Sequence, residues 1–505
     1  MWEKYMNQEE LKKVRFWPVM VAIFIGSFLC VLASATINLA LEILKDHFDT
    51  SLSSVQWTLT GFMLAMGTTA PIAGYLGERF SYRRLYLFSL IGFTVASVLC
   101  ASAWSEGSLI LFRVLQGAFS GLIIPATMSI IYQIIPRERQ AMAIAFWGLS
   151  AMLAPAFGPT ISGWVLENLN WHWLFLMNIP IGLIAIGFVY TYIPYYRMNV
   201  PKTFDGLGFL TVIVSSSSLL LALGQGHSWG WGSWKIVSLF AIGAIALILF
   251  VWRELTTETP LLNLRVFKNG RFTLNAIISN IITISLYSGT LLTPIFLQRI
   301  QHVSAMDTGM ILLPASLAMA LLMPVVGKLY GIIGPRWLMS SGIVLLTIGT
   351  LALSWLSLDV SHAYVIWWMI VRNIGIALVV MPSSNAAMEQ IPAELSGHAS
   401  AITNWTRNVF GSFAIAIFTT MLATRSVTHA TDFMKAGDVD ELHITMMSFT
   451  MSVNDVYVVA TLVAVVALPL SLLVGKAKRA DGTKPKVGKD KEVPSQLAAT
   501  VSAKS

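Results

Sequence analysis

Fourteen long apolar stretches, separated by polar or basic segments, run through this chain. A helix that crosses a membrane needs roughly 20 mostly apolar residues, because each residue advances about 1.5 Å along the axis. With 56% hydrophobic and 11% charged residues, the 505-residue chain is too apolar for a water-soluble protein. The stretches lie at approximately 17–41, 56–74, 85–104, 109–133, 141–165, 173–194, 206–225, 235–252, 273–297, 307–328, 337–357, 363–388, 398–422 and 455–475. We therefore expect an all-α integral membrane protein with fourteen transmembrane helices.

The distribution of basic residues predicts how the chain is oriented. With the N-terminus inside, 25 of the 33 Lys and Arg residues fall in cytoplasmic segments, and five fall in outer loops. Such an excess is typical of cytoplasmic loops, so we expect both termini in the cytoplasm. A twelve-helix alternative would leave out 206–225 and 235–252, which are plainly apolar. The net charge of +8 is scattered over short loops, which argues against nucleic acid as a partner.

A weak internal repeat predicts how the helices are grouped. Gly327 to Arg336 aligns without gaps on Gly74 to Arg83, and Pro392-Ala-Glu394 matches Pro136-Arg-Glu138, at offsets of 253 and 256 residues. Near-equal offsets indicate a six-helix unit used twice around a central cavity. We expect a cytoplasmic segment at 1–16, a six-helix bundle at 17–194, two inserted helices with a linker at 195–272, a second bundle at 273–475 with an outer loop at 423–454, and a disordered basic cytoplasmic tail at 476–505.

Several motifs together resemble the major facilitator superfamily. The segment Gly74-Tyr-Leu-Gly-Glu-Arg-Phe-Ser-Tyr-Arg-Arg84 resembles its loop signature, and Arg113-Val-Leu-Gln-Gly117 is similar to its fourth-span arginine motif. Three further stretches are similar to the fourteen-span drug:proton antiporter branch: Trp171 to Gly182, Pro260 to Phe267, and Asn404-Trp-Thr-Arg407. The resemblance covers residues 17–475. It implies two six-helix bundles that rock about a central cavity and export amphipathic compounds in exchange for protons.

The loop at 74–84 has two interpretations. As a gate, its glycines would let helix ends approach closely, and Glu78 would face the positive end of a neighbouring helix dipole. Such a contact would close the cytoplasmic side in one state and break in the other. As a plain solvated turn, the loop would only set topology through its arginines. Two residues depart from the family pattern, since Glu78 replaces aspartate and Ser81 replaces glycine. The predicted gate residues are Gly74, Gly77, Glu78, Arg79, Arg83 and Arg84.

The fifth span is rich in proline and glycine residues. Proline removes a backbone hydrogen bond and small residues permit close crossing, so these residues indicate a bent, tightly packed helix. Their pattern also resembles the motif that marks the antiporters of the superfamily. That resemblance implies that the span seals against its partner span in the other half. The alternative is an ordinary kinked membrane helix. The residues concerned are Gly148, Pro155, Gly158, Pro159 and Gly163.

Three arginines lie inside apolar stretches, where an arginine usually faces a polar cavity or a partner. They are Arg113, Arg372 and Arg407, and capping by backbone carbonyls is the alternative interpretation. The resemblance makes Arg113 a member of the proton relay. However, Ala33 occupies the position at which the family carries its proton-binding aspartate, and no Asp or Glu falls deep in a span. Uncharged Ser34 and Asn38 remain on that face, and we include Asn38 with the three arginines as a coupling candidate.

The missing carboxylate predicts the class of substrate. A buried carboxylate would attract cationic drugs, so its absence favours neutral or anionic amphiphiles over dications. We expect adaptable apolar and polar side chains to line the cavity. The candidates are Ser34, Asn38, Trp57, Met63, Trp147, Tyr287, Asn404 and Trp405.

Proton-coupled drug export across the cytoplasmic membrane of a bacterium is the function these features predict. An exporter or flippase of an endogenous lipid-like amphiphile, with weak or different ion coupling, is the alternative, because one fold serves many substrates. No arrangement of residues suited to catalysis is visible, so we expect no enzyme activity, no cofactor and no metal. The expected partners are small amphipathic substrates, protons and membrane lipids, and we expect a monomer.

Overall fold

A computed structural model describes residues 15–197, 204–435 and 440–474. The expected N-terminal segment and the basic tail after residue 475 thus lie largely outside the described residues. All regular structure in the described part is helical, as expected. The α-helices are α2 (Phe16–Thr36), α3 (Leu41–His47), α4 (Leu52–Val55), α5 (Trp57–Thr69), α6 (Ala73–Phe80), α7 (Tyr82–Ala101), α8 (Glu106–Ile134), α9 (Arg137–Asn168), α10 (Trp173–Leu176), α11 (Asn178–Tyr192), α12 (Gly206–Trp229), α13 (Trp234–Thr256), α14 (Gly270–Arg299), α15 (Ala305–Ile333), α16 (Pro335–Ala352), α17 (His362–Met388), α18 (Ser396–Lys435) and α19 (Glu441–Leu473). Short 3₁₀ turns lie at Ile37–Ala40, Ala70–Ile72, Leu264–Lys268, Leu353–Trp355 and Ala393–Leu395.

Local sequence fixes where several of these helices begin. The first backbone N–H groups of a helix lack partners within the helix, and Ser, Asn or Asp side chains can accept from them. Ser105 and Ser108 form a reciprocal capping box at the start of α8. At the starts of α12, α14 and α19, the side chains of Asp205, Asn269 and Asp440 accept from backbone N–H groups. Between the caps the runs are apolar, and in hydrocarbon only a helix satisfies its own backbone.

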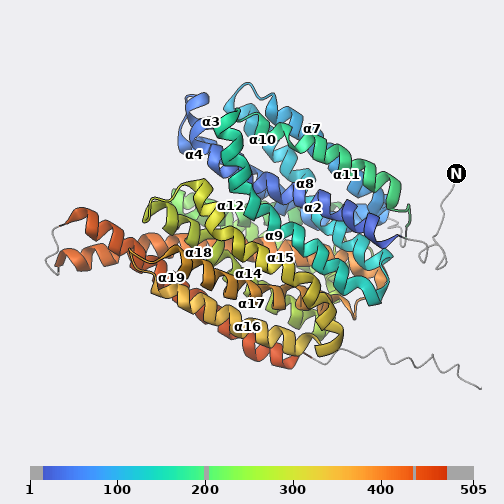
Figure 1. Cartoon of the computed structure of the whole chain (residues 1–505). Coiled ribbons are helices and arrows are strands. Elements are labelled where there is room, and N and C mark those ends of the chain that lie inside the picture. Colours follow the sequence, from blue (N-terminus) through green and yellow to red (C-terminus); the bar gives the residue numbers. More distant parts are fainter. Residues whose placement is uncertain (1–14, 198–203, 436–439, 475–505) are drawn as a thin grey trace, which may run out of the picture.

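The long helices form two groups that lie side by side. In the first group α2, α5, α7, α8 and α11 pack on one another, and in the second α14, α16, α17 and α19 do so. Figure 1 shows the first group in the upper part of the view and the second in the lower part, with α9, α12, α15 and α18 between them. Helix α9 packs extensively along both α2 and α15, so it joins the two groups. The predicted bundle boundaries themselves stay a prediction.

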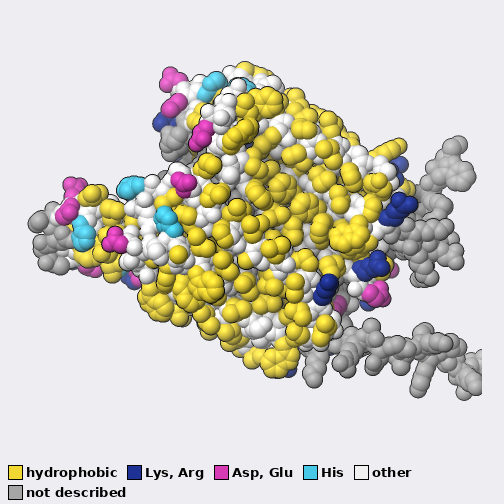
Figure 2. All heavy atoms as spheres, in the orientation of Figure 1, with side chains coloured by type: hydrophobic (Ala, Val, Ile, Leu, Met, Phe, Trp, Pro, Cys, Tyr) yellow, Lys and Arg dark blue, Asp and Glu magenta, His cyan; other side chains and the backbone are white. Residues whose placement is uncertain are grey.

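Thirteen helices in the described part of the chain are long and apolar enough to cross a membrane. The predicted span at 141–165 lies within α9, a 32-residue helix that is not among those thirteen. The described helices therefore agree with a many-span membrane protein, while the exact count of fourteen stays a prediction. In Figure 2 hydrophobic side chains form a broad belt around the molecule.

The two ends of the molecule differ in charge. In Figure 2, Lys and Arg side chains gather at the right-hand end, and most of the visible acidic and His side chains lie at the opposite end. We call the end that carries Glu78 the gate end. The opposite end carries a helical hairpin, because α18 continues to Lys435 and α19 begins at Glu441. The outer loop predicted at 423–454 is thus largely helical. The predicted orientation, which would place the gate end in the cytoplasm, stays a prediction.

The inserted helices α12 and α13 pack on each other, and α12 also packs on α5 and α18. Thr68 and Ser217 share a hydrogen bond of 3.3 Å between α5 and α12. The indole Nε1 of Trp405 on α18 donates to Ser216 Oγ at 2.8 Å. The inserted pair therefore contacts the first group through α5 and also packs on α18, which lies between the groups.

Candidate functional site

The predicted gate loop meets α18 at a buried contact. Glu78 lies in the last turn of α6, and its Oε1 is 3.1 Å from Nε2 of His398 in the first turn of α18. Both residues are only 6% exposed. The carboxylate thus faces the N-terminal end of a helix, where the macrodipole is positive. This is the type of contact that the gate interpretation predicts.

Small residues allow α6 and α18 to approach each other at this point. A Cβ on Gly74 would lie 3.3 Å from His398 Nδ1 and 3.6 Å from the carbonyl oxygen of Gly397. The ring of Tyr82 fills the remaining space, because a Cβ on either Gly77 or Gly397 would overlap it. The Tyr82 hydroxyl donates to the carbonyl of Gly74 at 3.2 Å. The absence of a side chain at Gly397 therefore allows α6 and α18 to approach each other.

Two of the loop arginines contact residues of their own half of the molecule. Arg83 Nη2 donates to the carbonyl of Tyr190 at 2.6 Å, and Arg84 lies 4.7 Å above the ring of Tyr195. Arg79 is exposed. Arg83 and Arg84 thus bind residues of their own half, while Glu78 reaches across to α18.

Ser81 forms a one-residue turn between α6 and α7 with a φ of 82°. In the second group, Gly334 stands 253 residues later between α15 and α16, with a φ of 84°. The repeat offset found in the sequence therefore reappears as the same backbone conformation. The turn stays tight although serine replaces the glycine of the family pattern, but a side chain with positive φ costs about 1 to 2 kcal/mol. Ser81 Oγ is also buried without a hydrogen-bond partner.

Replacing Ser81 with glycine is expected to stabilise the protein by about 1 kcal/mol, because it removes this strain. The matched change, Gly334→Ser, introduces the strain in the second copy and is expected to destabilise by a similar amount. Thermal unfolding of purified protein in detergent measures both. A Ser81→Gly variant that melts at or below the wild-type temperature would contradict the assignment of strain to this turn.

Helix α9 places its small residues against two neighbours. A Cβ on Gly158 would lie 2.8 Å from Ala35 Cβ on α2, and one on Gly148 would lie 3.3 Å from Met323 Cε on α15. A Cβ on Gly163 would lie 3.8 Å from Met306 Cβ on α15. The side chains of Pro155 and Pro159 lie outside the described residues. These contacts agree with the expectation that the fifth span packs against a span of the other half.

Arg113 is fully buried on α8 and contacts two other helices of its group. Its Nε donates to Thr58 O at 3.0 Å, and its Nη1 donates to Gln116 Oε1 at 2.6 Å and to Ala33 O at 3.4 Å. The guanidinium also lies 4.2 Å above the Phe62 ring. No carboxylate in the described part of the chain pairs with it. The arginine therefore reaches the backbone of Ala33, where the family carries its aspartate.

Arg372 on α17 occupies the equivalent place in the second group. Its Nη2 donates to Ser285 O at 2.6 Å and Leu286 O at 3.0 Å, both on α14. A Cβ on Gly289 would lie 2.5 Å from Arg372 Nη1, and Gly289 stands 256 residues after Ala33. Each half thus buries one arginine of α8 or α17 against its first long helix. The sequence contains this symmetry, but only the packing reveals that the two arginines correspond.

Arg407 lines a small pocket between the two groups of helices. Among the described residues, its guanidinium forms no hydrogen bond or ion pair, although Tyr132 and Tyr287 interact with it electrostatically. The Trp147 indole donates to Thr127 Oγ1 at 3.2 Å, and Asn404 Nδ2 donates to Ser400 O at 3.0 Å. The pocket is lined by Met128 and Tyr132 of α8, Trp147 of α9, Ser384, Ala387 and Met388 of α17, and Ser400, Thr403, Asn404 and Arg407 of α18.

The other predicted cavity residues lie elsewhere. Trp57 faces Trp229 with ring centroids 6.5 Å apart, and Met63 is 42% exposed. Trp405 points to the inserted helices, and Tyr287 packs on Gly411. The Ser34 hydroxyl donates to Val31 O of its own helix at 2.7 Å. The side chain of Asn38 lies outside the described residues. Among the predicted cavity residues whose side chains the structure describes, Trp147 and Asn404 line the pocket with Arg407.

Sequence reasoning missed two kinds of residue. Tyr132, Met128 and Met388 line the pocket, but nothing in their local sequence separates them from residues that pack on neighbours or face lipid. His398 was detectable as a titratable residue at the start of an apolar span. Its partner Glu78 comes from the other half, and a single sequence does not state such pairings.

Comparisons with known proteins agree with this geometry. The sequence model of the Major Facilitator Superfamily matches residues 23–416. The chain is 31% identical over 476 residues to the lincomycin resistance protein LmrB of Listeria innocua, covering 94% of this chain and 100% of that protein. It is 31% identical over 425 residues to the multidrug transporter protein MdtP of Bacillus subtilis, covering 84% and 78%. The structure of the proton:xylose symporter XylE is similar in fold, with a TM-score of 0.62 at 14% identity over 91% of this chain and 96% of that one. This chain is therefore a multi-pass membrane transporter that belongs to the major facilitator superfamily.

Proposed function

We propose that the protein exports amphipathic drugs or other toxic compounds across the cell membrane in exchange for protons, by alternating access. The pocket around Arg407 is the observation that carries this proposal. Its lining comes from α8 and α9 of the first half and from α17 and α18 of the second. A site between two bundles is exposed to one side and then the other when the bundles rock. The names of LmrB and MdtP, which refer to drug resistance and drug transport, support drugs as the cargo.

The chemistry of the pocket favours a neutral or anionic substrate over a dication. Arg407 supplies a positive charge without an acidic partner, and no Asp or Glu is among the pocket residues. Aromatic and methionine side chains (Trp147, Tyr132, Met128 and Met388) offer an adaptable apolar surface. An amphiphile with one negative group would place that group at Arg407 and its apolar part against these side chains.

Replacing Arg407 with alanine is expected to slow export of an anionic amphiphile by about tenfold or more, since it removes the pocket's charged partner. Export of the cation ethidium should stay the same or rise. The measurement is efflux of 1-anilino-8-naphthalenesulfonate and of ethidium from proteoliposomes with an imposed pH gradient. Arg407→Lys keeps the charge and should retain much of the anion transport.

Thr406→Ala is the matched control, because Thr406 is adjacent in sequence but does not line the pocket. Equal loss of both dyes in Arg407→Ala would contradict an anion-selective pocket. Wild-type efflux that does not depend on the gradient would remove the proton from the proposal. Wild-type protein that moves neither dye, together with a membrane-lipid defect in a deletion strain, would favour export of an endogenous lipid-like amphiphile.

A further inference from the structure

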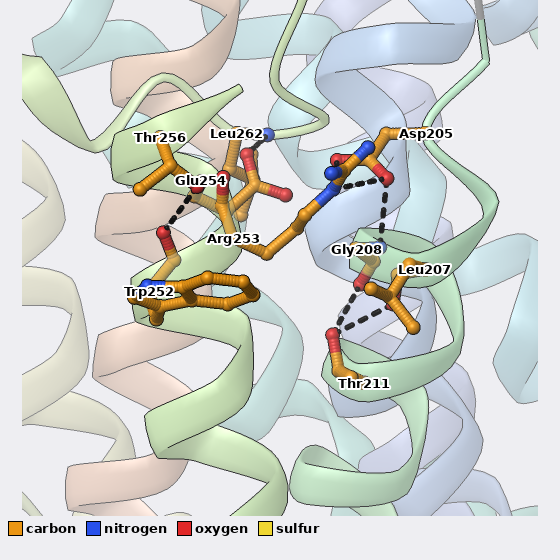
Figure 3. A network of polar contacts seen from close by, with 9 residues as sticks. All are labelled: Asp205, Leu207, Gly208, Thr211, Trp252, Arg253, Glu254, Thr256 and Leu262. Carbon is orange, nitrogen blue, oxygen red and sulfur yellow. Dashed lines mark hydrogen bonds and ion pairs between the residues drawn. The ribbon is translucent and has the colours of Figure 1, made fainter.

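The inserted helices α12 and α13 are joined into one unit. Figure 3 shows the Arg253 side chain of α13 extending toward Asp205, the residue before α12. Arg253 Nε is 3.1 Å from both carboxylate oxygens of Asp205, which also accepts from the backbone N–H of Gly208 at 3.0 Å. Farther along the pair, a Cβ on Gly243 would lie 2.8 Å from Leu219 Cδ2, so the helices also touch directly. An ion pair at one end and close packing along the length therefore hold the two helices together.

This unit is also tied to the second group of helices. Figure 3 shows the Glu254 carboxylate near the end of α13 lying against the backbone of Leu262, whose N–H donates to Glu254 Oε2 at 2.9 Å. Leu261 and Leu262 are 0% exposed, so the linker after α13 is buried here. The linker ends at Asn269, whose side chain accepts from backbone N–H groups in the first turn of α14. The segment 260–267, which resembles the fourteen-span branch, thus connects the unit to a helix of the second group through buried contacts.

Two indole groups join the unit to α18. Trp405 Nε1 of α18 donates to Ser216 Oγ of α12 at 2.8 Å. In the opposite sense, Nε1 of Trp231, between α12 and α13, donates to Thr420 Oγ1 of α18 at 2.9 Å. Each pair is separated by 189 residues in sequence, so α12 runs parallel to α18. The step of 15 residues from Trp405 to Thr420 places the two bonds about 22 Å apart along α18. Because α18 packs extensively on α14 and α19, these bonds again connect the unit to the second group.

These two bonds fix how the unit lies on α18. An indole N–H can only donate, and Ser216 is 0% exposed, so no water can replace it as the acceptor for Trp405. The Thr420 hydroxyl donates to Ala416 O at 2.8 Å, which leaves its oxygen free to accept from the other indole. Phe250 of α13, also 0% exposed, packs on Trp405 with ring centroids 6.1 Å apart. Sliding of the unit along α18 would break both bonds at once.

The interface between the unit and α5 is of a different kind. A Cβ on Gly67 would lie 2.6 Å from Leu220 Cδ1, so a leucine of α12 packs over a glycine of α5. The Thr68 and Ser217 hydroxyls are 3.3 Å apart, and a hydroxyl on a helix can turn to a carbonyl of its own helix instead. Packing without directional bonds lets two surfaces slide at low cost. Ring contacts extend this interface: Trp57 with Trp229, and Tyr75 of α6 with Phe204.

We propose that the inserted pair travels with the second half during transport, so that the moving interface on this side of the molecule lies between α5 and α12. The inference rests on the alternating access in the proposed function. When the halves rock, the two indole bonds to α18 are kept. The surface of α12 slides on α5, and the Thr68 and Ser217 hydroxyls separate and donate within their own helices. The pair thus covers the seam between α5 and α18, next to the pocket, throughout the cycle.

Reversible bridges across the two interfaces test the proposal. Both double variants are made in the full chain without Cys30 and Cys100. Thr68→Cys with Ser217→Cys joins α5 to α12, and Trp231→Cys with Thr420→Cys joins the inserted pair to α18. A bifunctional methanethiosulfonate reagent closes each bridge, and dithiothreitol opens it. The readout is efflux of 1-anilino-8-naphthalenesulfonate from proteoliposomes with a pH gradient. We expect the bridge between α5 and α12 to slow efflux by about tenfold or more, and the bridge to α18 to leave it within about twofold.

Each bridged protein is its own control, because opening the bridge between α5 and α12 should restore efflux. The single variant Thr68→Cys, treated with the same reagent, controls for modification without a bridge. Loss of efflux from the bridge to α18, with none from the bridge to α5, would assign the pair to the first half and overturn the proposal. Equal loss or equal tolerance at the two sites would overturn it as well. Wild-type protein that exports no dye would instead refute the proposed function.

Distances between spin labels decide the inference without any dye. Trp234 of the inserted pair, Val427 of α18 and Trp104 between α7 and α8 are all exposed, so cysteines there accept labels. We expect the distance from Trp234→Cys to Val427→Cys to keep one value. The distance from Trp234→Cys to Trp104→Cys should show two populations whose proportions change with pH. Any other pattern overturns the proposal.

Discussion

Replacing Arg113 with alanine is expected to abolish gradient-driven export and to lower the free energy of unfolding by about 3 kcal/mol. The guanidinium is fully buried and bonds to residues on two other helices, at Thr58 O and Ala33 O, as well as to Gln116. Alanine would leave Gln116 Oε1 with only the Cys100 thiol as a donor, at 4.0 Å, and would open a cavity next to Phe62. Efflux from proteoliposomes and thermal unfolding in detergent measure the two effects.

Two further variants separate charge from packing. Arg113→Lys keeps the positive charge but loses the planar fork that bonds to several acceptors at once. It should recover part of the stability and little of the transport. Arg372→Ala is the matched change in the second half, where the arginine bonds to Ser285 O and Leu286 O. If Arg372→Ala loses as much stability as Arg113→Ala but its export still depends on the pH gradient, the coupling role belongs to Arg113. Normal export by Arg113→Ala would contradict any role for Arg113 in coupling.

Replacing Gly397 with valine is expected to stop transport by preventing closure at the gate end. The new side chain would overlap the ring of Tyr82, which has no room to move because it also packs on Gly77. Relieving the overlap separates α6 from α18 and breaks the Glu78 contact with His398. Accessibility of a cysteine placed at Ser396, in a background without Cys30 and Cys100, measures the opening. We expect its maleimide labelling from the gate side to rise by about tenfold or more.

Gly331→Val is the control for this experiment. Gly331 lies in the last turn of α15, at the position that the repeat offset aligns with Glu78, and a Cβ there would meet no atom within 4 Å. It should leave both labelling and transport close to wild type. Unchanged labelling in Gly397→Val would show that the contact between α6 and α18 does not close the gate.

The helical membrane fold was predictable because it depends on properties of single segments. Apolar length predicts a membrane helix, so the span at 206–225 could be recognised within α12 without knowledge of its neighbours. The repeat was visible in the sequence because both copies keep a basic loop of the same length. The conformation of Ser81 and Gly334 now gives that repeat a structural basis.

The arrangement of the site was not predictable to the same extent, because it depends on pairs of residues far apart in sequence. Trp405 and Asn404 are adjacent, yet one faces the inserted helices and the other lines the pocket. A helix turns by about 100° per residue, so its sequence predicts which residues share a face but not which neighbour that face meets. Glu254 of α13 shows the same limit, since it is charged and near a helix end, yet it is buried next to Gly208 of α12 and the backbone of Leu262 (Figure 3).

The length of α18 has a mechanical consequence. This helix has 40 residues and carries His398 at one end, Arg407 along its course and the exposed hairpin at the other end. At about 1.5 Å per residue, the distance from His398 to Lys435 is roughly 55 Å. A tilt of about 10°, comparable to rigid-body rotations in other proteins, would move the tip by nearly 10 Å. The helix is thus a lever that magnifies a small displacement at a buried gate into a large one outside the bilayer, and anything that clamps the hairpin would also hold the gate.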